Sequence, residues 1–126
     1  MRTNAIQAKD APSGQGYAQA LKLRDFDELL FISGQIPETT EGDVPSDFDD
    51  QCRIVWHNIE AQLRAADMSL DNLVKITTFL SHPIQREPQS RIRQEILGNR
   101  QIALTVIICN IYSSRWLLEI EAIAAR

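Results

Sequence analysis

Two glutamates in the last stretch of the chain could carry acid–base chemistry. Alternation over residues 115–124 places Glu119 and Glu121 on one face of a β-strand, about 6 to 7 Å apart, beside the apolar residues Leu117 and Ile123. The opposite face of this strand is wholly apolar. A carboxyl group that is partly removed from water has a raised pKa, which is common where protons are transferred. The same pattern also fits a sheet with one face in water, so the strand alone leaves both interpretations open.

Other types of catalytic site are poorly supported. Cys52 and Cys109 lie far apart, form no C-x-x-C pair and resemble small core residues. His57 and His82 have no partner at a metal-ligand spacing, so no metal site is predicted. The chain also lacks a G-x-S-x-G sequence and a glycine-rich phosphate loop.

Length and composition predict one globular domain. The chain has 126 residues, of which 44% are hydrophobic and 24% charged. We expect residues 1–15 to form a polar N-terminal arm and residues 16–126 a single domain, because Pro12, Gly14 and Gly16 interrupt the first stretch. No apolar run approaches 18 residues and no secretory signal is evident, so the expected location is the cytoplasm.

The charge balance argues against nucleic acid as the main partner. The net charge is −4 and the isoelectric point is about 5.1, whereas binding to a phosphate backbone calls for a basic surface. One region is nevertheless rich in arginine, and it could meet a carboxylate or phosphate or be the solvated face of a short helix. It contains Arg86, Arg91, Arg93 and Arg100.

Periodicity predicts five strands and two helices. A helix should begin after Ser46, which with Asp49 resembles a capping box, and should end near Ala66. A shorter helix should end at Leu97, with Gly98 as its C′ residue. Gly34 lies inside a strand and indicates a β-bulge or the close approach of another group. The predicted strands cover residues 17–23, 29–37, 72–80, 102–109 and 115–124.

The predicted order is β-β-α-β-α-β-β, which gives an α+β domain with a mixed sheet and both helices on one face. The other face of this sheet would remain uncovered. We therefore expect copies of the chain to associate through it.

Four segments together resemble the RidA family, also known as YjgF or the endoribonuclease L-PSP family. They are residues 17–20 (YAQA), 30–37 (LFISGQIP), 71–79 (DNLVKITTF) and 119–124 (EIEAIA). The resemblance implies a chorismate-mutase-like fold, a homotrimer with clefts at the subunit interfaces, and no cofactor. In active members the cleft hydrolyses reactive enamines and imines to ketoacids and ammonia. By motif, Glu119 falls on the family's catalytic carboxylate, Tyr17 on its pocket tyrosine, and Ser33 and Gly34 on its pocket strand.

The chain departs from the family at its carboxylate-binding arginine. Members read Pro-Ala-Arg before the apolar strand, but here Ala103 stands in the arginine's place, or Leu104 if the match shifts by one residue. Neither side chain can bind a carboxylate. Arg93 or Arg100 could supply the charge from another direction, provided that its geometry is fixed.

Three functions follow from this resemblance. The first is a divergent trimer that binds a small metabolite or hydrolyses an atypical imine. The second is an active deaminase of 2-imino or enamine acids that releases ketoacid and ammonia. The third, an endoribonuclease or translation inhibitor, fits an acidic chain without a histidine pair poorly.

Overall fold

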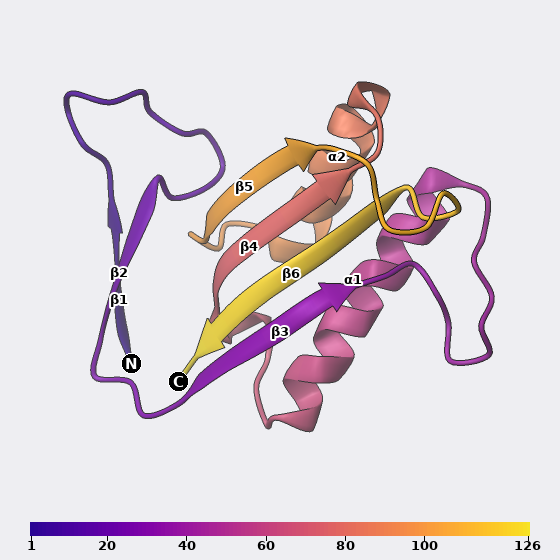
Figure 1. The fold of residues 1–126 in the computed structure, drawn as a ribbon. Coiled ribbons are helices and arrows are strands. Elements are labelled where there is room, and N and C mark those ends of the chain that lie inside the picture. The colour runs from indigo at the N-terminus through magenta and orange to yellow at the C-terminus, as the bar shows by residue number, and fades with distance from the viewer.

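The computed structural model describes all residues, 1–126, and contains two sheets and two helices (Figure 1). Two short 3₁₀ turns, η1 (Leu70–Asn72) and η2 (Pro83–Gln85), precede β4 and α2. No helix combines the length and the apolar character that crossing a bilayer requires. The elements in chain order are β1 (Arg2–Ile6), β2 (Ala20–Arg24), β3 (Leu29–Gln35), α1 (Phe48–Ala65), β4 (Leu73–Leu80), α2 (Arg86–Leu97), β5 (Ala103–Ile108) and β6 (Leu118–Ala125).

The main sheet has four strands in the order β3-β6-β4-β5. The last strand, β6, therefore lies inside the sheet, antiparallel to both β3 and β4. Strand β5 is parallel to β4, with Lys75 opposite Ala103 and Phe79 opposite Ile107. Parallel neighbours need a crossover connection, and α2 provides it. The α+β class and the mixed sheet predicted from the sequence are confirmed.

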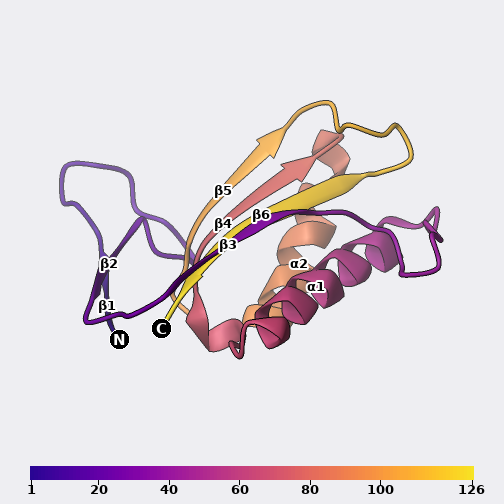
Figure 2. The same ribbon diagram turned by 60° about the horizontal axis from the view of Figure 1, so that its bottom comes forward.

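Both helices cover the same face of this sheet, and the other face is bare (Figure 2). The core lies between the two layers, where Val55, Ile59 and Leu63 of α1 are fully buried against alternate residues of the strands. Inward-facing residues of β6 are buried as the alternation predicted, with Leu118 and Ala124 fully buried. One face of β6 is thus buried in the core, and the opposite face carries Glu119 and Glu121.

The ends of the helices follow local sequence signals, with one small correction. The cap of α1 is Asp47, whose side chain accepts a hydrogen bond from the Asp50 amide, and not the predicted pair Ser46 and Asp49. Each pair has the same three-residue spacing, and the cap that forms is one residue later. Helix α2 ends as predicted at Gly98, which has a φ of +58°.

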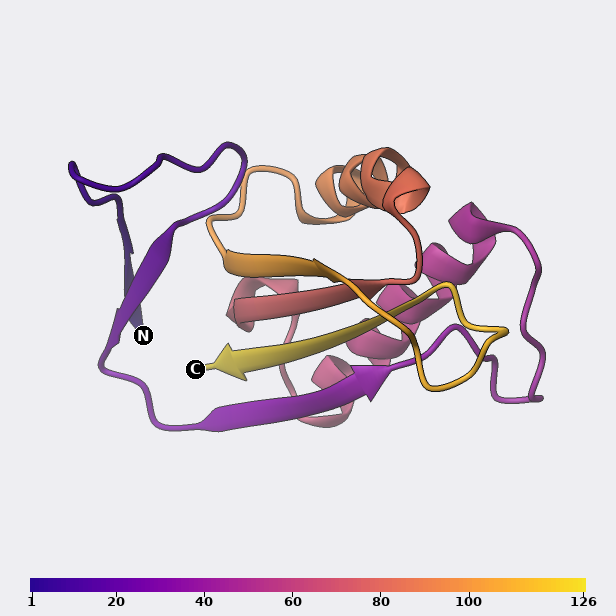
Figure 3. The same cartoon turned by 45° about the horizontal axis from the view of Figure 1, so that its top comes forward.

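The N-terminal region differs from the prediction. Residues 2–6 were expected to lack regular structure, yet they form β1 and pair with β2 in a separate two-stranded sheet. Figure 3 shows this hairpin standing apart from the main sheet. A single parallel bridge between Ala18 and Ala103 connects the chain just before β2 to the edge of β5. The polar residues of β1 are all exposed, so no hydrophobic pattern marked this strand.

The bare face of the sheet is partly apolar. Phe31 is 71% exposed, Leu29 47% and Ile107 41%, and all three belong to strands of the main sheet. Large apolar side chains on one exposed sheet face are typical of surfaces that take part in binding.

Candidate functional site

Glu119 lies directly over Gly34 of the neighbouring strand. The pairing of β3 with β6 is irregular between Ile32 and Gln35, and Gly34 sits in this irregularity. A Cβ atom on Gly34 would stand 2.7 Å from Cδ and 3.0 Å from Cγ of Glu119, which is closer than side chains tolerate. Gly34 therefore makes room for the carboxyl group of Glu119. Both features predicted for Gly34, the bulge and the close approach, are present.

The surroundings of Glu119 favour its protonated form. Burial raises the pKa of its carboxyl group, and the charge of Glu121 raises it further. Glu119 is half-buried, whereas Glu121 is exposed, although both point to the bare face of the sheet. Of the two glutamates, Glu119 thus has the environment of an acid–base group. Ser33, next to Gly34, is exposed on the same side of the molecule.

A second group of polar residues lies on and beside α2. Arg93 is half-buried, and its guanidinium donates weak hydrogen bonds to Oε1 of Gln89 at 3.3 Å and to Oγ of Ser90 at 3.4 Å. No carboxylate lies within 4.0 Å of it, and burial lowers the pKa of Arg93 while the nearby Tyr17 raises it. A half-buried guanidinium without an anionic partner can bind an anionic group of a ligand.

The other candidate cation, Arg100, already has partners. Its Nε donates to Oδ1 of Asp71 at 2.9 Å, and its Nη1 donates to the carbonyl oxygen of Leu97 at 3.0 Å. Elsewhere in the same arginine-rich region, Arg91 pairs with Asp49 at 2.8 Å. Of Arg91, Arg93 and Arg100, only Arg93 therefore has no carboxylate partner.

Ala103 is the first residue of β5 and lies far from Glu119 on the same chain. It is opposite Lys75 on β4, whereas Glu119 is opposite Phe79 on the other side of β4. Ala103 and Glu119 are four residues apart along the strand direction and two strand spacings apart across the sheet. Their backbones are therefore separated by about 16 Å. Tyr17 precedes the Ala18 bridge to Ala103, so it lies at the β5 edge as well.

The predicted site residues consequently form two groups. One group, with Glu119, Gly34 and Ser33, lies where β3 meets β6, and the other, with Tyr17 and Arg93, lies at the β5 edge and α2. Strands β3 and β6 lie on one side of β4 and β5 on the other, so the two groups are separated within one chain. Sequence reasoning missed Gln89, which is buried and bonded to Arg93; the available signal was its position four residues before Arg93 on a helix.

The structure contains no metal centre or disulfide. No group of three or more acidic, histidine or cysteine side chains is arranged to hold a metal ion. Cys52 is buried in the core and Cys109 is half-buried, and both are free thiols.

Comparison with known proteins identifies the family. The family model described as Endoribonuclease L-PSP matches residues 8–126. A RutC family protein of Pyrococcus horikoshii is 36% identical over 122 residues, which cover 94% of each chain. The putative reactive intermediate deaminase TdcF of Escherichia coli K12 is 30% identical over 127 residues, covering 96% of this chain and 95% of TdcF.

Solved structures agree with this result. YyfA, a Rid-family protein of unknown function from Yersinia pestis, superposes with a TM-score of 0.74 at 32% identity, covering 99% of this chain and all of YyfA. YyfB from the same organism gives a TM-score of 0.84 over the whole of both chains, and at 21% identity it supports the fold alone. The chain belongs to the endoribonuclease L-PSP family, which is the RidA/YjgF family.

Proposed function

We propose that this protein hydrolyses a reactive imine or enamine in a cleft formed between copies of the chain. The observation that carries the proposal is the half-buried carboxyl group of Glu119, which lies over Gly34 and has a raised pKa. A half-buried carboxyl group that can both accept and release a proton suits this reaction, which needs proton transfer and water. The family relative named as a reactive intermediate deaminase supports the same chemistry.

In the proposed reaction, water adds to the carbon of the C=N bond while the nitrogen gains a proton. The C–N bond then breaks, so that one imine and one water give one carbonyl compound and one ammonia. Glu119 takes the proton from the attacking water and returns it to the leaving nitrogen, which requires a group that is stable in both protonation states. An enamine first gains a proton at carbon and becomes the imine. No cofactor is needed for any of these steps.

Arg93 is the proposed partner for an anionic group of the substrate. It is half-buried beside Tyr17 and free of carboxylates, whereas Arg100 is paired with Asp71. It thus supplies from α2 the charge that Ala103 cannot supply from β5. A guanidinium can hold a carboxylate through two parallel hydrogen bonds. This role favours a 2-imino or enamine acid over an uncharged imine.

A second copy of the chain would complete this cleft. The groups around Glu119 and Arg93 lie on different parts of one chain, and about 16 Å separates the backbones of Glu119 on β6 and Ala103 on β5. The exposed apolar residues of the bare face, such as Phe31, favour burial between copies. The proposed assembly is the homotrimer that the family resemblance implies.

The test is the hydrolysis of a 2-imino acid generated in situ by an amino-acid oxidase. We expect the native protein to accelerate ketoacid release and Glu119→Gln to abolish this acceleration with the assembly intact. Arg93→Gln should raise KM for the imino acid by about 10- to 100-fold, because a hydrogen bond to a charged group contributes about 1.5–3 kcal/mol. The matched control is Arg86→Gln, an exposed arginine of the same helix. Unchanged turnover in Glu119→Gln would refute the mechanism.

The alternative is a protein that binds a metabolite without converting it, and the alanine at position 103 favours it. In that case the native protein does not accelerate imine hydrolysis, and a ligand raises its melting temperature in a concentration-dependent manner. Ala103→Arg would then be expected to restore turnover. If the native protein already accelerates hydrolysis, the binding-only alternative is excluded.

A further inference from the structure

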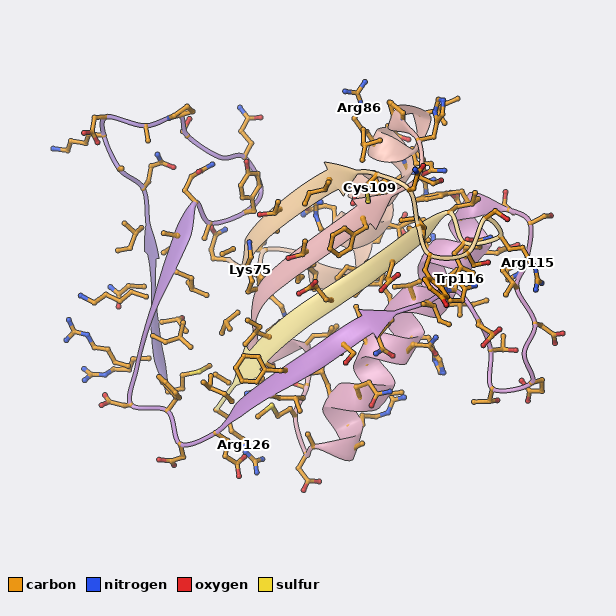
Figure 4. All side chains as sticks on the ribbon, viewed as in Figure 1. Lys75, Arg86, Cys109, Arg115, Trp116 and Arg126 are labelled. Carbon is orange, nitrogen blue, oxygen red and sulfur yellow. The ribbon has the colours of Figure 1, made fainter.

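A groove unrelated to the proposed cleft opens at the N-terminal end of α1. It has a volume of about 610 Å³ and lies between the loop before α1, the first turns of α1 and the segment that leads into β6. None of the proposed cleft residues lines it. Arg115 and Trp116 mark this end of the molecule in Figure 4, beside the start of α1. The volume is typical of sites for small molecules, which are about 300–1,000 Å³.

One buried side chain, that of Gln51, holds two walls of this groove in place. Gln51, which is 1% exposed, donates from Nε2 to the carbonyl oxygens of Pro45 at 2.7 Å and Arg115 at 2.9 Å. Its Oε1 accepts from the Leu117 amide at 2.8 Å. Gln51 thereby ties the loop before α1 to the segment before β6. Rigid walls favour binding because little order is lost when a ligand enters.

The groove contains opposite charges that do not neutralise each other. Arg115 lines it, as do Asp43 and Asp50, and none of these three side chains has an ion pair or a side-chain hydrogen bond through its charged group. The fourth charged residue, Arg53, uses its Nη2 for an ion pair with Glu95 at 2.9 Å. The free groups available to a ligand are therefore one guanidinium and two carboxylates.

We infer that this groove binds a zwitterion of the α-amino acid class. The ligand carboxylate pairs with Arg115, and the ammonium group pairs with Asp43 and Asp50. An anion alone would face two carboxylates and a cation alone would face two guanidiniums, whereas a molecule with both charges satisfies all of them. Val44 and Ile54 add apolar surface to the lining for an aliphatic side chain.

The experiment is an NMR titration of the full-length protein with L-valine. Two matched analogues each remove one charge: 3-methyl-2-oxobutanoate lacks the ammonium group and isobutylamine lacks the carboxylate. We expect saturable amide shifts at Gly42 and Arg115 with L-valine, and at least about tenfold weaker binding of either analogue. Arg115→Gln and Asp50→Asn should each weaken L-valine binding at least about tenfold, since each removes one charge-assisted contact.

Two variants separate this groove from the proposed cleft. Arg64→Gln, an exposed arginine in the last turn of α1, should bind L-valine as the native protein does. Glu119→Gln should also bind it normally, even where it abolishes imine hydrolysis. The inference is wrong if no saturable shift occurs up to about 10 mM L-valine, a weak limit of affinity. It is equally wrong if the shifts gather at Gly34 and Glu119, or if both analogues bind as well as L-valine.

Discussion

Replacing Gly34 with alanine tests the contact on which the site is built. The added Cβ would overlap Oε2 of Glu119 and stand 2.7 Å from its Cδ, so the whole carboxyl group must move away before ordinary contact at 3.4 Å is reached. The backbone itself accepts alanine, because φ of Gly34 lies outside the left-handed range. The cost therefore arises from crowding against one side chain, for which about 1–3 kcal/mol is typical.

The expected result depends on what stands at position 119. In the native background, Gly34→Ala should lower the free energy of unfolding by about 1–3 kcal/mol. In a Glu119→Ala background the same change should raise it by about 0.4–1 kcal/mol, because the unfolded chain loses freedom and nothing is crowded. The coupling between the two sites, which is the difference between these effects, should thus be about 1.4–4 kcal/mol.

The assay is urea denaturation of the four proteins at one fixed protein concentration, since association contributes to apparent stability. Imine hydrolysis provides a second measurement, because displacing a catalytic group by about 1 Å lowers kcat/KM by about 100-fold. Equal effects of Gly34→Ala in both backgrounds would refute the placement of Glu119 over Gly34. Full activity of the single variant would refute the need for this contact in catalysis.

Three further predictions concern single groups. Because the pKa of Glu119 is raised, the folded protein binds more protons than the unfolded chain between pH 4.5 and that pKa. The free energy of unfolding should therefore fall as pH rises through this window. In urea denaturation, the Glu119→Gln variant should lack this decline. Gln51→Ala leaves the Leu117 amide and two carbonyl oxygens unpaired and should lower the free energy of unfolding by about 2–4 kcal/mol, whereas exposed Gln62→Ala should change it little. Burial raises the pKa of the Cys52 thiol to about 12, so a thiol reagent at about pH 8 should label it only in denaturant, and labelling in the native state would contradict this.

The elements that the sequence predicted well are those with local signals. Helix α1 was located because its apolar stripe and acidic first turn lie within one segment, and its N-cap was misplaced by only one residue. Strand β1 was missed because its pairing partners in β2 lie 14 to 22 positions away in the chain and most of its own residues are polar. Pairing between distant segments leaves no pattern in either segment alone.

The candidate site divides in the same way. The motif singled out Glu119 and Gly34 separately, but their contact depends on how β3 and β6 are aligned. The choice between Arg93 and Arg100 also needed the fold, because Asp71, which binds Arg100, is 29 positions away. The groove beside Arg115 left no motif, since three separate segments form it.

The place of β6 in the sheet has a consequence for how the protein is made. The ribosome adds β6 after every other element, yet this strand lies between β3 and β4 and provides hydrogen bonds to both. Until residues 118–125 emerge, those two strands have no shared neighbour, and the apolar stripe of α1 has only part of a sheet to cover. Completion of the domain must therefore wait until β6 has been made, and nascent chains that stop short of β6 should be substrates for chaperones.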